Sequence, residues 1–416
     1  MNSVQILLLT LLTFFGLYYL WVSSKTKNYF NGLTIQVANI YILYILMPFI
    51  WTFYHSDMYY SNYKITVNNF FVIALFMVVW FLSLTSGYLL GHRKIIYINP
   101  KLRQQQLKRL SILFFLFAVF IFLVFISIVG TEAIYNPRAV YLTTRLGFGP
   151  LTFGLAMFTK LFLIFGLFYF RNKWLLLLSS AMLVWVLGSK STIIIFFIIF
   201  AYYKIFIEEN YVYLKKFILL AIGGFAFLLT IYFLFSPNIT LDELSLVLMY
   251  FSQYADYNFN FSILIDELPN FYYGQIGFEN NIYAFIPRFI YPEKPTIYGA
   301  FQLSYLIFPE AMMKFTGAPS FGLFGPYYAD FGYFGLLAIM IKYLFYGYIL
   351  GAIENSLKRF KNPFLFLLLL IYSTIPIISA GIGGIFVDVV NILIVIILLN
   401  FYKIKNNILN KRIILK

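Results

Sequence analysis

Residues 111–129 read SILFFLFAVFIFLVFISIV, an apolar run without a single charged side chain. A helix needs about 20 mostly apolar residues to cross the hydrocarbon core of a bilayer, so this run predicts a transmembrane helix. The rest of the chain repeats the pattern: 62% of its 416 residues are hydrophobic and only 11% are charged. Soluble globular proteins are about 25% charged, so the composition excludes that class.

The repeated apolar runs predict an all-α, polytopic integral membrane protein with about 11 transmembrane helices. The expected spans are 4–22, 35–54, 70–91, 111–129, 151–170, 174–188, 191–207, 217–235, 332–353, 363–380 and 385–402. The sixth and seventh are short and nearly fused, so one broken or re-entrant hairpin is an alternative interpretation. The chain then divides into N-terminal helices (1–130), a first external loop (131–150), central helices (151–235), a long external loop (236–331) and C-terminal helices with a cytoplasmic tail (332–416).

The formal charge of +15 reflects orientation in the membrane and does not indicate a nucleic-acid partner. With the N-terminus outside and the C-terminus in the cytoplasm, most of the 30 Lys and Arg residues fall in cytoplasmic segments. This is the asymmetry that the positive-inside rule describes. The chain has no cysteine and only two histidines, so we expect neither a disulfide nor a thiolate or histidine metal centre, and no cofactor.

The long external segment 236–331 is too rich in aromatic residues to read as a disordered linker, and long loops with order are usually functional. Thr240 and Glu243 resemble a capping box. Apolar residues at helical spacing follow, which predicts an amphipathic helix over 241–267 that lies at the outer interface and stops at Pro269.

Two predicted external loops contain the same string of residues. The first begins Pro137-Arg138-Ala-Val-Tyr141 and the second begins Pro287-Arg288-Phe-Ile-Tyr291. Each continues to an aromatic-Gly pair, which ends at Gly149 in the first loop and at Gly299 in the second.

Each loop also carries a second cation, which is Arg145 in the first loop and Lys294 in the second. External cations oppose the positive-inside rule, and an anionic ligand would offset that bias. The planar fork of Arg suits bidentate binding of phosphate oxygens. The alternative is that these cations pair with loop carboxylates such as Glu132 or Glu293, or with lipid head groups.

These residues resemble the O-antigen and capsule repeat-unit polymerases, the Wzy family, whose two external loops each carry an Arg-x10-Gly motif. Arg138 to Gly149 and Arg288 to Gly299 match that spacing. The phrases Ile286-Pro-Arg-Phe-Ile-Tyr-Pro-Glu-Lys-Pro295, Gly188-Ser-Lys-Ser191 and Tyr328-Ala-Asp-Phe-Gly-Tyr-Phe-Gly335 also look like such polymerases. The resemblance covers roughly residues 130–350.

The resemblance implies a glycosyltransferase of the bacterial cytoplasmic (inner) membrane that polymerises undecaprenyl-pyrophosphate-linked repeat units on its outer face. Its partners would be these lipid-linked glycans, the bilayer, and the chain-length regulator and flippase of the same pathway. Cationic side chains would stabilise the leaving pyrophosphate without a metal, which agrees with the lack of an Asp-x-Asp pair in any external loop. The corresponding binding residues would be Arg138, Arg145, Arg288, Lys294, Tyr141 and Tyr291.

A general base is expected to activate the acceptor hydroxyl. Asp256, Glu279, Glu293 and Asp330 are the external candidates, and we favour Asp330 and Glu293 as catalytic residues. Asp330 stands beside the aromatic-Gly entry to a span, near the membrane surface.

Three lysines are candidates to line a polar cavity or to pair with interior polar groups: Lys160, Lys190 and Lys342. The pairs Gly87-x3-Gly91 and Gly347-x3-Gly351 predict faces where helices pack closely.

Two other classes of protein would share parts of this pattern. An O-antigen ligase uses the same donor, but the family resemblance leads us to expect a histidine in its long external loop, and 236–331 has none. A lipid-linked oligosaccharide flippase would carry cations in a central cavity, with more evenly spaced spans and no long ordered external loop.

Overall fold

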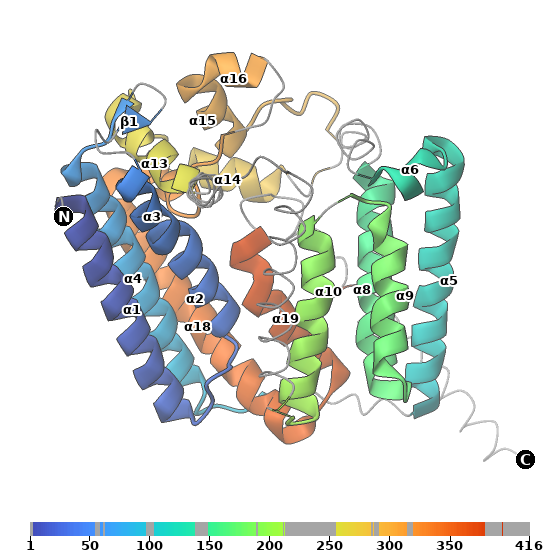
Figure 1. Ribbon diagram of the computed structural model, residues 1–416. Coiled ribbons are helices and arrows are strands. Elements are labelled where there is room, and N and C mark those ends of the chain that lie inside the picture. Colours follow the sequence, from blue (N-terminus) through green and yellow to red (C-terminus); the bar gives the residue numbers. More distant parts are fainter. Residues whose placement is uncertain are drawn as a thin grey trace, which may run out of the picture. The chain divides into compact units, whose positions relative to one another are not determined.

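The computed structural model is helical, which confirms the predicted all-α class (Figure 1). It describes residues 3–54, 59–60, 63–96, 104–137, 149–188, 190–210, 212, 255–283, 286, 291–313, 319–378 and 393. In this part of the chain, the only β-structure is a two-stranded antiparallel pairing of β1 (Tyr59–Tyr60) with β2 (Tyr63–Lys64).

The chain forms two compact units whose division runs through two helices, α18 and α19. Unit 1 comprises residues 1–95, 225–355 and 372–386, and unit 2 comprises 96–224, 356–371 and 387–416. The elements before α13 are α1 (Ser3–Thr26), α2 (Thr34–Ile40), the π-helix η1 (Tyr41–Leu46), α3 (Met47–Tyr54), α4 (Val67–Gly91), α5 (Gln104–Val129), α6 (Glu132–Tyr135), α8 (Gly149–Tyr169), α9 (Lys173–Trp185), α10 (Lys190–Tyr202) and η2 (Tyr203–Ile207). The later ones are α13 (Asp256–Glu267), α14 (Gln275–Ile282), α15 (Ala300–Ile307), α16 (Pro309–Met313), α17 (Gly325–Phe331), η4 (Gly332–Phe334), α18 (Gly335–Phe360) and α19 (Pro363–Ile378).

Six helical segments are long and apolar enough to cross a membrane: Ser3–Thr26, Thr34–Phe53, Val67–Gly91, Gln104–Val129, Leu151–Tyr169 and Gly325–Phe360. Three shorter apolar helices, Lys173–Trp185, Thr192–Ile207 and Pro363–Ser373, occupy other predicted spans. The sixth and seventh predicted spans correspond to the short helices α9 and α10, an arrangement that fits two spans as well as one broken or re-entrant hairpin. The predicted spans 217–235 and 385–402 fall outside the described residues, apart from Leu393, so the total of about 11 stays a prediction.

Helices α4 and α18 of unit 1 touch through the two Gly-x3-Gly pairs. A Cβ atom added at Gly87 would lie 2.0 Å from the Leu344 carbonyl oxygen, and one at Gly91 would lie 1.9 Å from that of Tyr348. A Cβ at Gly347 would likewise meet a backbone oxygen of α4 at 2.1 Å. The prediction that these glycines form packing faces is confirmed, because only glycine lets the two backbones approach this closely.

A buried carboxylate lies one turn beyond this contact. Glu354 of α18 is fully buried and accepts hydrogen bonds from Tyr88 Oη at 2.6 Å, the Gly32 N–H at 2.7 Å and Asn28 Nδ2 at 3.2 Å. A buried charge is costly unless such donors surround it. These bonds therefore fix the α1–α2 connection and α4 to α18.

Helices α13 to α16 gather at one end of the unit 1 helices (Figure 1), so the described part of the long 236–331 segment is largely helical. Helix α13 ends at Glu267, two residues before Pro269, as predicted. Residues 258–264 of α13 are all buried inside unit 1, so this part of the helix has no solvent-facing side, and its predicted position at the membrane interface stays a prediction. Its aromatic side chains pack inside the unit, with Phe259 against Trp51 and Phe261 against Phe76.

The polar residues of α13 are buried because other helices offer them partners. In an α-helix, the N–H of residue 48 would donate to the carbonyl of Tyr44, but Pro48 has no N–H. The chain forms the wider π-helix η1 just before this proline. Asn258 Nδ2 donates to this Tyr44 carbonyl at 2.6 Å. Asn69 Nδ2 of α4 donates to Asp266 at 2.7 Å and to Ser262 Oγ at 3.0 Å. Periodicity alone assigns such residues to a solvent-facing side, and these hydrogen bonds override that assignment.

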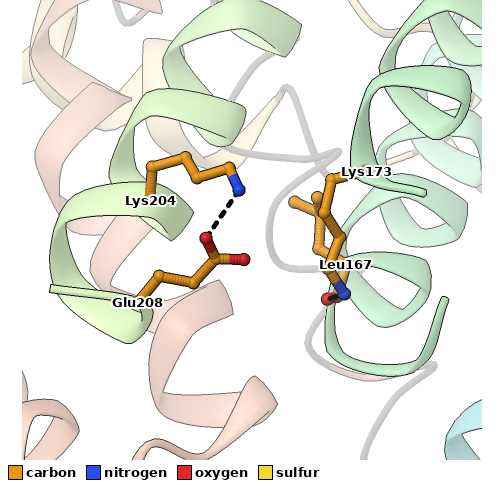
Figure 2. A network of polar contacts seen from close by, with 4 residues as sticks. All are labelled: Leu167, Lys173, Lys204 and Glu208. Carbon is orange, nitrogen blue, oxygen red and sulfur yellow. Dashed lines mark hydrogen bonds and ion pairs between the residues drawn. The ribbon is translucent and has the colours of Figure 1, made fainter. Parts of the chain in front are cut away.

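In unit 2, a small polar network closes the ends of α8 and η2 (Figure 2). Lys204 Nζ pairs with Glu208 Oε2 at 2.5 Å. Lys173, the first residue of α9, donates to the carbonyl of Leu167 in the last turn of α8. Carbonyls at a helix C-terminus have no intrahelical donor, and a lysine there satisfies one of them. Both contacts stabilise helix ends.

Candidate functional site

The candidate site is built around the second Arg-x10-Gly motif. Arg288 lies outside the described residues, whereas Tyr291, Glu293, Lys294 and Gly299 are described. The first motif can be placed only at its end, because Arg138, Tyr141 and Arg145 also fall outside the described part. The predicted convergence of the two arginines therefore stays a prediction.

The glycine of the second motif has a specific structural reason. Gly299 has φ +59° and ψ −132°, a conformation that suits glycine alone, and it is the N-cap of α15. Its N–H donates to Glu279 Oε2 at 2.7 Å, and the N–H of Ala300 donates to Asn280 Oδ1 at 3.0 Å. A Cβ atom at residue 299 would lie 2.1 Å from Asn280 Oδ1. We call this contact of α14 with the start of α15 the Glu279–Gly299 latch.

The latch closes the base of the segment that carries Arg288. Residues 279–280 and 299–300 are held together, so the two ends of the intervening segment, which contains Arg288, lie side by side. The first motif also ends where a helix starts, since Gly149 is the first residue of α8. In both motifs the glycine therefore stands at or next to the start of a helix.

Asp330 holds the other end of α14. Gly274, the N-cap of this helix, has no side chain to cap the first N–H groups. Asp330 of α17 supplies the missing acceptors: its Oδ1 accepts from the Ile276 N–H at 2.9 Å and its Oδ2 from the Gly277 N–H at 2.8 Å. The side chain is 2% exposed. Both oxygens are thus engaged in positioning α14, and the predicted catalytic role of Asp330 stays a prediction.

Lys294 contacts the residues that precede Arg288 in the chain. Its Nζ donates to the carbonyl of Tyr283 and, at 3.2 Å, to that of Ile286, and it sits 5.0 Å from the centre of the Tyr298 ring. Lys294 therefore joins both sides of the segment that contains Arg288. These contacts give it a role in loop shape beside its predicted role in binding an anion.

An aromatic cluster lines the loop, because the ring of Tyr283 packs against those of Tyr291 at 6.2 Å and Tyr298 at 5.4 Å. Tyr291 is 36% exposed, and Glu293 lies exposed on the adjacent turn. Both candidates are therefore accessible from solvent.

Burial raises the pKa of the Tyr272 phenol, with a smaller contribution from the charge of Glu279.

The three lysines predicted to line a cavity differ in their surroundings. Lys160 is buried within α8. Lys342 of α18 is exposed, donates to Tyr327 Oη and lies over the rings of Tyr327 at 5.2 Å and Tyr343 at 5.6 Å. The backbone of Lys190 begins α10 and its side chain is outside the described part. Their roles in a cavity stay predictions.

Sequence reasoning missed two members of the site. Asn280 completes the latch, and Asn258 fixes the start of α13 to Tyr44. Neither residue belongs to a recognisable motif. The one sequence feature that pointed to the latch was Gly299. The structure explains why this position needs a glycine, because the Asn280 side chain leaves no room for a Cβ atom.

Comparison with known proteins gives two significant relatives. No family model matches the chain, and no solved structure is similar to it at a significant level. The relatives are the O-antigen polymerases of Salmonella typhimurium and Salmonella typhi, each 28% identical over 361 residues, which cover 84% of this chain and 86% of the relative. The resemblance noted in the sequence is therefore confirmed, and the chain is similar over most of its length to these two O-antigen polymerases.

Proposed function

We propose that this protein polymerises undecaprenyl-pyrophosphate-linked repeat units into O-antigen or capsular polysaccharide, by glycosyl transfer on the outer face of the cytoplasmic membrane. The observation that carries the proposal is its similarity to O-antigen polymerases over 84% of its length. The apolar helices suit an integral membrane enzyme acting on a lipid-linked glycan. These relatives favour a polymerase over the alternatives of a flippase or a ligase.

The chemistry assigned to the loops follows from the leaving group. When the anomeric C–O bond breaks, negative charge develops on the lipid pyrophosphate, and preorganised cations stabilise it. Arg138, Arg145 and Arg288 are proposed to bind its oxygens, with Tyr141 and Tyr291 beside the glycan. The Glu279–Gly299 latch supports this role for Arg288, because it anchors both ends of the loop that carries the guanidinium. In this proposal the transfer needs no metal.

The surroundings of the enzyme follow from the same proposal. It would lie in the cytoplasmic (inner) membrane with its N-terminus outside and its C-terminus in the cytoplasm. A flippase would deliver lipid-linked units to the outer face, and a chain-length regulator would act on the growing polymer. Both are proposed as partners.

The test replaces Arg288 with Ala in a host whose own copy of this polymerase gene has been deleted. The loss of a fixed cation should leave single-repeat products and no long chains on a polysaccharide gel, with protein amounts equal to wild type. Arg171→Ala is a matched control, because Arg171 is exposed between α8 and α9, on the predicted cytoplasmic side. Full-length chains from the Arg288 variant would remove the proposed role of the second loop. A transport defect would instead stop single units from appearing on the outer face.

A further inference from the structure

The four carboxylates that are candidates for the general base differ in what their oxygens do. Asp330 accepts two backbone N–H groups, as described above. Glu279 accepts from Gln275 Nε2 through Oε1 and from the Gly299 N–H through Oε2, both at 2.7 Å. Glu293 is exposed on a turn. Two of the four are therefore committed to holding α14 and α15, and the third, Glu293, is open to solvent.

Asp256, in the first turn of α13, is in a different situation. Its side chain is half-buried, and its Oδ1 is shielded from solvent with no hydrogen-bond partner among the described residues. Burial raises the pKa of this carboxyl to about 6, against the opposing effect of the Tyr257 N–H. A carboxyl that takes up a proton near neutral pH suits general-base work at ordinary pH.

The backbone around Asp256 is fixed by several contacts, as a catalytic group requires. Asn258 Nδ2 donates to the Tyr44 carbonyl at 2.6 Å. The ring of Tyr257 stacks on that of Tyr44 with centroids 5.7 Å apart. The hydroxyl of Tyr44 in turn accepts from the Leu323 N–H at 2.6 Å, which ties this end of α13 to the turn before α17.

In the described part of unit 1, no positively charged side chain pairs with Asp256. The titratable groups on the neighbouring elements are phenols and carboxylates. Phenols face it from its own helix (Tyr257) and from η1 (Tyr44). The polar partner that α4 offers α13 is the neutral Asn69, at the far end of α13 near Asp266. Helix α17 packs against α13 through the phenol of Tyr328, whereas Asp330 of α17 bonds to α14. The one titratable residue of α15 is Tyr305.

We propose that Asp256 is the general base that accepts the proton of the acceptor sugar's hydroxyl group. This inference rests on the proposed function. The hydroxyl oxygen forms a bond to the anomeric carbon of the donor, and the anomeric C–O bond to the pyrophosphate breaks with its electron pair on the phosphate oxygen. The hydroxyl proton moves to the Asp256 carboxylate, which then releases it to water.

The experiment uses the full-length protein in lipid nanodiscs with the undecaprenyl-pyrophosphate-linked repeat unit of its host. Initial rates of linkage between two units are measured from about pH 5 to about pH 8, a range that brackets the expected pKa. Asp256→Asn keeps the shape of the side chain and removes the base. Asp266→Asn is the matched control, since it makes the same change on the same helix and weakens the contact of α13 with Asn69.

For wild type, the base must be deprotonated, so the rate should be half-maximal near pH 6, approach its full value at higher pH and fall at lower pH. Asp256→Asn should lower kcat by about 10²–10⁴-fold, abolish this acid limb and leave the KM for the donor nearly unchanged. Asp266→Asn should keep the acid limb. A rate for Asp256→Asn within about threefold of wild type, or a surviving acid limb, would overturn the assignment.

Two further outcomes are separable. If Asp256→Asn does not fold, Asp256→Glu decides: a displaced carboxylate should shift the acid limb by about half a pH unit or more, and an unmoved limb rejects the base. If wild type itself joins no units, the proposed function fails. If wild type is active and Asp256→Asn is equally active, only the assignment of Asp256 fails.

Discussion

The backbone N–H of Gly299 donates to the carboxylate of Glu279 across 2.7 Å, and this bond joins the end of an Arg-x10-Gly motif to a helix twenty residues earlier. The bond thus joins the two ends of the segment 279–299, and Arg288 stands between these ends in the sequence. The glycine is required by its backbone angles and by the Asn280 side chain beside it.

Gly299→Ala should prevent long-chain synthesis while the protein still inserts. The φ of +59° costs an L-residue about 1–3 kcal/mol, and the new Cβ would collide with Asn280 Oδ1, so the loop must open. A polysaccharide gel measures the outcome. Gly154→Ala is the control, because its Cβ would meet only the flexible end of Ile121 at 3.1 Å. A normal ladder from the 299 variant would show that the latch is dispensable.

Asp330→Asn should reduce the rate of chain extension about tenfold without moving the acid limb of the pH profile. An amide offers one acceptor where the carboxylate offers two, so one of the Ile276 and Gly277 N–H groups loses its partner. The nanodisc rate assay across pH measures both quantities. Loss of the acid limb in this variant would identify Asp330 as the base and contradict the assignment of Asp256.

Gly347→Ala should destabilise the fold by about 1–3 kcal/mol, because its Cβ would lie 2.1 Å from the Leu84 carbonyl oxygen and force α4 and α18 apart. Thermal unfolding in detergent measures the change in Tm. Gly16→Ala is the matched control, since a Cβ at this helical glycine meets nothing within 4 Å. Equal melting of the two variants would argue against close packing of the helices.

The predicted orientation can be tested with single cysteines, because the chain has none of its own. A membrane-impermeant maleimide added to intact spheroplasts should label Glu293→Cys, whereas Lys361→Cys should react only after permeabilisation. Both side chains are exposed, so reactivity reports the side of the membrane and not burial. Labelling of Lys361→Cys in intact cells would reverse the proposed topology.

The sequence predicted much of the helical framework because long apolar runs leave few alternatives. The run 70–91 corresponds to α4 (Val67–Gly91), and its Gly-x3-Gly spacing correctly indicated a close helix contact. The solvent-facing side predicted for α13 was wrong, since its asparagines look solvent-facing in a periodic pattern but are buried. Their partners lie far away in the sequence, as Asn258 shows with the carbonyl of Tyr44.

The candidate site was only partly predictable for a similar reason. The motif identified Gly299 and the loop, and the comparisons agree with the resemblance it suggested. Asp330 uses both carboxylate oxygens to cap α14 because α17 packs against residues 274–277. No local sequence pattern encodes that packing. These two hydrogen bonds also distinguish Asp330 from Asp256, whose Oδ1 has no partner among the described residues. The sequence alone gives no sign of this difference.

The proline-induced gap in the second span also constrains how the protein is made. The donor for the Tyr44 carbonyl comes from a residue 214 positions later in the chain. At ribosomal speeds of about 5–20 residues per second, the early helices wait on the order of ten to forty seconds for that amide. Until then their bundle is unfinished, so the N-terminal helices reach their final packing only after the segment that carries Asp256 has left the ribosome.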